Sequence, residues 1–446
     1  MRYIDINNIA YLHHGWKRHL RAKKKKSKTP KSDCGEQCSI IQEHSEPSLV
    51  SFMTKFCENK SSLVSIGNKI RTPKNFCIFS NPKEVLSWLR RFITFSLQKK
   101  VVEVTVDHTK TRKFCLTSEV LLGLIAKDIQ ERRKFLKMPI EYNGILNKNN
   151  EHSELLAEVG IVSELKDAFS THQPMAPEKI HVFKQVCFRH ESASSTSDDL
   201  KSITSQNFVE HLNKALRDHQ LKLTESAAGD IKGCLGEIID NANEHSGTTA
   251  PVWYVRGYVN NQEEIKVKYL ELMVANLGKS ISDTFTSLVD SSMAKREAKR
   301  YVEHHLGHGF TKEELYSVAA LQGNISSKNT DDDATRGQGT IKLIETFEQL
   351  YNNYLQLRRG RSDVCAQMNL ISGGVIIRFD GKLKSQVVQD VHGGERVIMP
   401  FNELGDLRVL PDGNYVSRID GAYFPGLLIN IRIPLTGSTT PLRDDD

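Results

Sequence analysis

The chain has 446 residues, of which 26% are charged and 39% are hydrophobic, and its formal net charge is +7. This composition excludes a collagen-like, mucin-like or wholly disordered chain and predicts a soluble globular protein. Because no run of about 18 apolar residues is present, we expect no membrane-spanning helix, and the length favours two or three domains at roughly 150 residues each.

The positive charge is concentrated near the N-terminus. Nine Lys and Arg residues but no acidic residue lie between Lys17 and Lys31, and without them the net charge would be −2. A basic body is typical of nucleic-acid-binding domains, whereas a short basic segment on a near-neutral body favours only a weak contact with DNA or RNA. Residues 21–48 are rich in Lys, Ser, Glu, Gln and Pro, so we expect a basic, partly disordered extension over residues 1–70.

The cysteines and the first residues bear on the cellular location. The first 20 residues lack the apolar core of a secretory signal. Eight cysteines are spread along the chain, and the one close pair, Cys34 and Cys38, has no second pair or histidine cluster at zinc spacing. Scattered cysteines without an export signal are typical of a reducing compartment, so we predict a cytoplasmic protein.

A region with alternating strand and helix patterns begins near residue 75. Residues 82–97 have helical apolar spacing, residues 101–106 alternate as a strand, and residues 118–129 carry a second helical stripe. This order predicts a small α/β domain. The strand, the Asp-His-Thr string at 107–109 and the following helix together resemble a STAS-type domain, the fold of anti-sigma-factor antagonists, although any small α/β domain fits the pattern.

The sharpest motif lies on a helix predicted around residues 233–246. Its apolar face comprises Leu235, Ile238, Ile239 and Ala242. Glu237 and Asn241 are four residues apart and project from one turn of a second face, which His245 continues. An amide oxygen suits Mg²⁺, and a carboxylate can orient or deprotonate a water molecule aimed at a phosphate. An amphipathic helix with a solvated polar face explains the same spacing.

This Glu-x-x-x-Asn-Ala string resembles the N-box of the GHKL superfamily, the ATP-binding fold of DNA gyrase B subunits, Hsp90 chaperones, histidine kinases and MutL proteins. The resemblance implies that Asn241 binds Mg²⁺ and that Glu237 is the catalytic residue. We include His245 among the expected nucleotide-binding residues because it continues the stripe. The implied fold is an α+β sandwich in which helices cover one face of a mixed sheet.

A second family motif follows the apolar strand expected at 269–275. The string Asn-Leu-Gly-Lys-Ser-Ile from Asn276 resembles the G1 box, Asp-x-Gly-x-Gly-Ile, whose Asp accepts a hydrogen bond from the adenine amino group. Asn276 keeps an acceptor oxygen but lacks the charge, Gly278 matches the motif, and Ser280 replaces its second glycine. We therefore expect weaker or altered adenine binding, whereas a simple turn at a strand end explains the string without a ligand.

The Arg-Gly-Gln-Gly-Thr string resembles the G2 box, Gly-x-Gly-Leu at the start of a helix. Gly337 and Gly339 let the backbone approach phosphate oxygens, and a helix N-terminus favours anions. Arg336 adds a positive charge, and Thr340 stands in place of the usual Leu. The polar residues 282–335 between the two glycine boxes correspond to the family's ATP lid.

These motifs predict a Mg-ATP-binding protein that hydrolyses ATP or transfers its phosphoryl group in regulation or signalling. It is not a conventional histidine kinase, because His190 follows a strand rather than lying on a helical hairpin. A degenerate, non-catalytic scaffold and a nucleic-acid-associated ATPase are the alternatives. We expect a protein partner. The family resemblance also implies a homodimer, although no heptad run supports one.

The expected domain organisation follows from these patterns. The resemblance to the ATP-binding family covers about half of the chain, and the Ser/Asp-rich stretch before it is typical of a linker. The predicted boundaries are an extension over 1–70, a small α/β domain over 71–170, a linker over 171–200, an ATP-binding domain over 201–436 and a tail over 437–446.

Overall fold

A computed structural model describes most of the chain. The described residues are 48–54, 65–148, 150–165, 169–171, 181–188, 197–245, 252–259, 268–322, 338–357, 366–389 and 395–442. Residues 47–446 form one compact unit, and the other unit, Met1–Glu46, contains no described residue. The basic segment Lys17–Lys31 and the pair Cys34 and Cys38 therefore lie outside the described residues.

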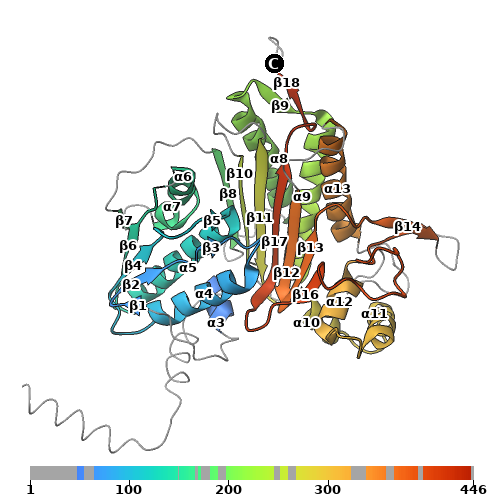
Figure 1. Ribbon diagram of the computed structural model, residues 1–446, viewed down its shortest axis with the longest axis horizontal. Helices are drawn as coiled ribbons and strands as arrows, with labels where there is room; N and C mark the ends of the chain where they lie inside the picture. Colours follow the sequence, from blue (N-terminus) through green and yellow to red (C-terminus); the bar gives the residue numbers. More distant parts are fainter. Residues whose placement is uncertain are drawn as a thin grey trace, which may run out of the picture. The chain divides into compact units, whose positions relative to one another are not determined.

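The N-terminal part of the compact unit is a small α/β region (Figure 1). Its elements are α3 (Leu49–Thr54), β1 (Ser65–Ile66), β2 (Lys69–Arg71), β3 (Asn75–Phe76), α4 (Pro82–Ser96), β4 (Glu103–Asp107), β5 (Lys113–Phe114), α5 (Leu116–Phe135), β6 (Glu141–Ile145), α6 (Asn150–Glu158), α7 (Ile161–Leu165) and β7 (Phe169–Thr171). The sheet order is β1-β2-β4-β6-β7, and β2, β4, β6 and β7 pair in parallel.

The expected helices of this region are present. The apolar residues of each helix line the faces that are buried in the core. Helix α4 begins at a proline, whose fixed φ suits a first helical turn, and its apolar stripe is buried. In helix α5, every residue from Leu116 to Ala126 is buried, as expected of a helix covered on all sides. Helix α3 lies within the predicted extension over 1–70, yet its residues Leu49 to Met53 are buried and it packs against α5.

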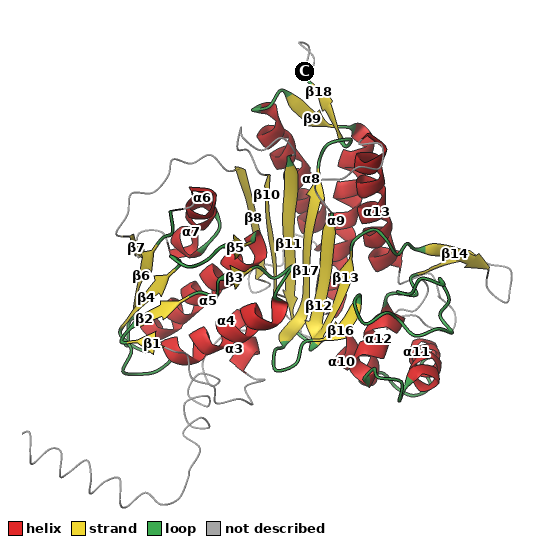
Figure 2. Cartoon of the chain, in the orientation of Figure 1, coloured by secondary structure: helices red, strands yellow, loops and turns green. Residues whose placement is uncertain are grey.

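The C-terminal part contains a seven-stranded sheet with helices on one face (Figure 2). Its elements are β8 (His181–Phe188), α8 (Ser197–Arg217), β9 (Leu221–Leu223), α9 (Glu225–His245), β10 (Val252–Val259), β11 (Tyr269–Leu277), α10 (Ile281–Thr286), α11 (Met293–His305), α12 (Lys312–Ala320), α13 (Gln338–Leu357), β12 (Gln367–Gly373), β13 (Val375–Phe379), β14 (Gln386–Gln389), β15 (Glu395–Ile398), β16 (Val416–Arg418), β17 (Phe424–Pro434) and β18 (Thr439–Pro441).

The sheet differs from the expected one in the direction of its strands. Its order is β16-β13-β12-β17-β11-β10-β8, and each described pairing is antiparallel. The mixed sheet implied by the family resemblance is therefore wrong for these seven strands, while the coarser α+β class is confirmed. A hairpin between β12 and β13 reverses the chain. The connection from β11 to β12 crosses the length of the sheet through α13, so these two strands run in the same direction, and β17 lies between them and runs antiparallel to both.

Both faces of this sheet are buried. Along β11, Leu272 and Val274 join the apolar core that the helices α8, α9 and α13 share with the sheet. The alternate residues Met273 and Ala275 join a second core, which the sheet shares with the N-terminal α/β region. Side chains alternate between the two faces of a strand, so a strand with apolar residues at successive positions needs a cover on each side.

A hydrogen bond to the buried Glu271 and one buried ion pair hold the N-terminal region against the sheet. Glu271 of β11 accepts a hydrogen bond from Arg432 Nε of β17 at 2.6 Å and one from the backbone N–H of Leu116 at 2.7 Å. That N–H belongs to the first turn of α5, where backbone donors lack partners within the helix. Arg256 of β10 contacts Glu164 of α7 at 3.1 Å. No helix among the described residues is long and apolar enough to cross a membrane.

We predict that Glu271→Ala lowers the free energy of unfolding by about 2–3 kcal/mol, because it removes the buried partner of the partly exposed Arg432 and the acceptor of the Leu116 N–H at the start of α5. Urea unfolding monitored by circular dichroism measures this change. The control is Glu303→Ala, which removes an exposed pair with Lys299 on α11 and should cost no more than about 0.5 kcal/mol. Equal effects of the two substitutions would contradict a structural role for Glu271.

Candidate functional site

The predicted N-box lies on α9 as expected. Leu235 and Ile239 are fully buried against the sheet, whereas Glu237 and Asn241 are half-buried on another face of the helix. The neighbouring acid Asp240 pairs with Lys201 of α8, so this carboxylate holds α9 against α8. Glu237 and Asn241 therefore remain as the acid and the amide available on one turn of α9.

Helices α9 and α13 run side by side in opposite directions. Helix α9 follows β9, which pairs with β18 beyond the Pro434 end of β17, and it leads toward the start of β10. Helix α13 leads toward the start of β12, which pairs with the Pro434 end of β17. A Cβ atom on Gly233 would lie 3.3 Å from Lys342 Nζ of α13. Since Glu237 is one turn beyond Gly233, it lies beside the first turn of α13.

Asn276 lies at the same end of the sheet. It is near the end of β11, opposite Trp253 of β10 and Leu427 of β17. By the alternation along β11, its side chain is on the face that α9 covers, like Val274. Asn276 is 5% exposed, and no described residue donates a hydrogen bond to its Oδ1. An unsatisfied buried acceptor costs about 1–3 kcal/mol, so this oxygen is a candidate for ligand binding.

Ser280 has a structural role that explains its departure from the G1 box. Its Oγ accepts a hydrogen bond from the backbone N–H of Asp283 at 3.1 Å and donates one to Asp283 Oδ2 at 2.7 Å. The two residues form a capping box at the start of α10, which satisfies backbone donors that have no partner within the helix. The serine side chain thus serves α10, and the structure does not place it with Glu237 and Asn241.

The G2 residues are described only in part. Gly339 and Thr340 lie in the first turn of α13, and Thr340 is half-buried. Arg336 and Gly337 lie outside the described residues, as do residues 323–335 of the expected lid. The rest of that segment, residues 282–322, contains α11, α12 and most of α10. His245 is the last residue of α9, and its side chain is also outside the description. Gly278 follows β11 with φ +152°.

The geometry therefore brings together part of the predicted site. Glu237 lies beside the first turn of α13, Asn241 lies one turn further along α9, and Asn276 lies at the same end of the sheet and on the same face. Phosphates bind at helix N-termini, and Mg²⁺ binds amide oxygens. A carboxylate can orient and deprotonate water, and a buried acceptor without a partner can bind an amino group. The residues of the described part of the site thus fit Mg-ATP.

A buried polar group in the N-terminal region was missed by the sequence patterns. His108, Glu119 and His152 offer ligand atoms that all lie within 4.8 Å of one another, and all three side chains are buried. The residues are far apart in the sequence, and the only local signal is that His108 directly follows a strand. Histidine and carboxylate ligands suit zinc or iron.

The hydrogen bonds of this group favour a structural interpretation over a metal centre. Asn147 Nδ2 lies 2.8 Å from His152 Nδ1 and also donates to a backbone oxygen, so His152 Nδ1 is the acceptor. The proton of the neutral ring then resides on Nε2, which lies 2.7 Å from Glu119 Oε1. A metal-binding histidine shows the opposite pattern, since its free nitrogen donates. No described residue hydrogen-bonds either ring nitrogen of His108.

A scan against models of protein families, a search of curated proteins and a search of solved structures each found no match to this chain. The candidate site therefore rests on the arrangement of its own residues.

We predict that the free energy of unfolding falls as the pH is lowered from about 6.5 to about 4. Burial lowers the pKa of His108 to about 4 and that of His152 to about 3, so the unfolded chain binds more protons in this range. Burial also raises the pKa of Glu119 to about 7, which opposes the trend because the folded state then holds the proton.

Replacing one of these histidines tests this prediction. His108→Asn should reduce the pH dependence of unfolding by up to about one proton, or about 1.4 kcal/mol per pH unit. Urea unfolding of both proteins at half-unit pH intervals measures the two slopes. Equal slopes for the wild type and the variant would show that His108 is not neutral in the folded state.

Proposed function

We propose that this chain is a Mg-ATP-binding protein of the GHKL type that acts in regulation or signalling, with ATP hydrolysis or phosphoryl transfer as its chemistry. The observation that supports the proposal best is the position of Asn276. A buried acceptor without a described partner lies at the end of the sheet where Glu237 is beside the first turn of α13 and Asn241 follows one turn later. The N-box spacing and the order of the two glycine strings agree with this proposal.

Each residue of the site would have a distinct task. Asn276 Oδ1 would accept a hydrogen bond from an adenine amino group, and Asn241 Oδ1 would hold Mg²⁺. Bound Mg²⁺ supplies positive charge that neutralises phosphate oxygens. Backbone N–H groups in the first turn of α13 would bind phosphate oxygens, as helix N-termini do. Glu237 would orient a water molecule and accept its proton.

The second candidate function is a scaffold that binds no nucleotide. Two observations favour it over an enzyme: Ser280 uses its side chain to cap α10, and an uncharged Asn276 stands where the family has an acid. A neutral acceptor forms a weaker hydrogen bond than a charged one. Calorimetric titration with Mg-ATP at millimolar concentration distinguishes the two candidates, because the absence of binding would leave only the scaffold.

We predict that Glu237→Gln keeps Mg-ATP binding within about twofold and lowers the rate of turnover by about 10²–10⁴, because the amide cannot accept a proton from water. Phosphate release and equilibrium binding measure the two effects. The matched control is Asp230→Asn, which removes a carboxylate two turns earlier on the same helix and should leave both unchanged. Binding without turnover in the wild-type protein would contradict the hydrolysis reaction.

Asn276→Ala should weaken ATP binding about fivefold, the contribution of one neutral hydrogen bond. The matched ligand is purine riboside triphosphate, which lacks the 6-amino group of adenine. Its affinity should be the same for the wild type and the variant, because neither protein makes the bond. If Asn276→Ala weakens both ligands equally, Asn276 does not contact the amino group and the proposed orientation of the base is wrong.

A further inference from the structure

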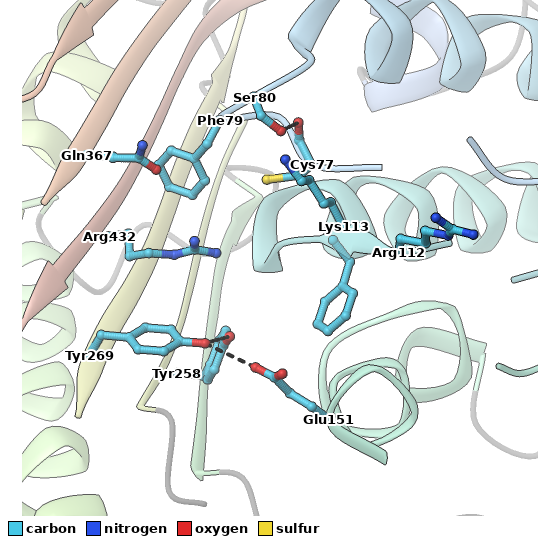
Figure 3. A pocket seen from close by; sticks show the side chains of 11 residues that line it. Cys77, Phe79, Ser80, Arg112, Lys113, Glu151, Tyr258, Tyr269, Gln367 and Arg432 are labelled. Carbon is cyan, nitrogen blue, oxygen red and sulfur yellow. Dashed lines mark hydrogen bonds between the residues drawn. The ribbon is translucent and has the colours of Figure 1, made fainter. Parts of the chain in front are cut away.

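A pocket lies where the N-terminal region meets the second face of the seven-stranded sheet (Figure 3). Its volume is about 360 Å³. Strands β10, β11, β12 and β17 form one wall, and the segments around β3 and β5 form another. The Cys77 thiol opens into this pocket, and the Arg432 guanidinium is directed into it from β17. This face of the sheet is opposite to the one that carries Asn276.

Cys77 directly follows β3, and Cys115 directly follows β5. The two strands pair in parallel, with Asn75 opposite Lys113 and Phe76 opposite Phe114. The backbone N–H of Ile78, the residue after Cys77, donates to Cys115 Sγ at 3.3 Å, so the two cysteines are neighbours. Neighbouring strands are about 4.8 Å apart, and disulfides form between Cα atoms at about 4.4–6.8 Å. The backbone therefore holds the two cysteines within reach of a disulfide bond.

The two thiols are free but in contact. The Cys115 thiol interacts with Cys77 Sγ and lowers the pKa of Cys77, and the backbone N–H of Ser80 donates to the Cys77 backbone oxygen at 3.3 Å. On its other side, Cys115 Sγ accepts the backbone N–H of Ile78 at 3.3 Å and lies 3.3 Å from Ser118 Oγ. Cys115 is the residue before the first turn of α5, and a helix N-terminus favours negative charge nearby.

The surroundings give the two sulfur atoms different reactivity. The interaction with the Cys115 thiol, with a smaller effect of the positive Arg432, outweighs burial and the nearby Glu271 carboxylate and lowers the pKa of Cys77 to about 6. Burial raises the pKa of Cys115 well above its ordinary value, so Cys115 keeps its proton. The thiolate is the nucleophilic form of cysteine. Cys77 is thus the attacking sulfur, and it is also the one that lines the pocket.

We propose that Cys77 and Cys115 form a dithiol that small hydroperoxides oxidise reversibly to a disulfide, with Cys77 as the peroxide-reactive residue and Cys115 as the resolving residue. The site is distinct from the proposed nucleotide site and does not depend on it. Its substrate class is hydrogen peroxide or a small alkyl hydroperoxide, which fits the pocket.

The proposed reaction has two steps. The Cys77 thiolate attacks one peroxide oxygen, the O–O bond breaks, and water or an alcohol leaves after protonation, which produces a sulfenic acid at Cys77. The Cys115 sulfur then attacks the Cys77 sulfur, the S–O bond breaks, and the hydroxide leaves as water with the proton from Cys115. The two sulfur atoms are oxidised, and the hydroperoxide is reduced. A thiol reductant reverses the reaction by thiol–disulfide exchange.

The test uses the full-length protein and maps each cysteine by mass spectrometry. The reduced protein is treated with one equivalent of hydrogen peroxide at pH 7, its remaining thiols are blocked, and it is digested with trypsin. Cys77 and Cys115 fall in the separate peptides 75–83 and 114–127. We expect these peptides to be joined by a disulfide and to separate again after treatment with dithiothreitol.

Two substitutions distinguish the roles of the cysteines. Cys115→Ser should stop oxidation at the sulfenic acid, so dimedone should label Cys77, whereas Cys77→Ser should leave Cys115 reduced. The internal control is Cys234 on α9, where burial raises the pKa of the thiol to about 12. Cys77 should react at least about 100-fold faster than Cys234 in the same sample.

The wild-type protein alone can overturn the proposal, so the result does not depend on the folding of a variant. If Cys77 stays reduced at ten equivalents of peroxide while other cysteines oxidise, Cys77 is not peroxide-reactive. If Cys77 is oxidised but its disulfide partner is a cysteine other than Cys115, the assigned resolving residue is wrong. Failure of ATP binding affects neither outcome, because the readout is the oxidation state of each thiol.

Discussion

The need to cover both faces of one sheet governs this structure. Strand β10 is buried at every position, and β11 is buried at all but its first residue. Antiparallel sheets commonly leave one face to water, but these strands are apolar on both faces. Helices α8, α9 and α13 cover one side, and the N-terminal α/β region covers the other. Glu271 belongs to this constraint, since its buried carboxylate pairs with Arg432 of the sheet and accepts the Leu116 N–H at the start of α5.

Because both of its faces are covered, the sheet separates two chemical environments, one on each face. On the helix-covered face, the end of β11 and the start of α13 bring a polar side chain and backbone donors to the end of the sheet that carries Glu237 and Asn241. On the opposite face, the contact between the two regions leaves a pocket lined by a reactive thiol and by Arg432. Adjacent residues of β11 alternate between these environments. One strand therefore contributes to the proposed nucleotide site and to the interface beside the proposed dithiol.

Several parts of this arrangement are predictable from local pattern. The apolar stripes over 82–97 and 118–129 correspond to helices α4 and α5, and the N-box helix corresponds to α9. Glu237 and Asn241 share a face because residues four apart on a helix always do. The mixed sheet was wrong because strand direction follows from long connections rather than from local sequence. We predicted that Ser280 contacts the nucleotide, although the sequence also contains Asp283 three residues later, and the two residues form a capping box at the start of α10.

The sequence alone determined helices α4, α5 and α9, the strand β11 and the polar pair on α9, since these depend on spacing within one element. Only the tertiary structure decided what each element faces. Asn276 lacks a described partner because of where β11 ends against α9, and Cys77 meets Cys115 because β3 and β5 pair in one register. His108, Glu119 and His152 meet through three separate elements. Such contacts depend on the order of strands and on burial, which are properties of the whole fold and leave no periodic signal in the chain.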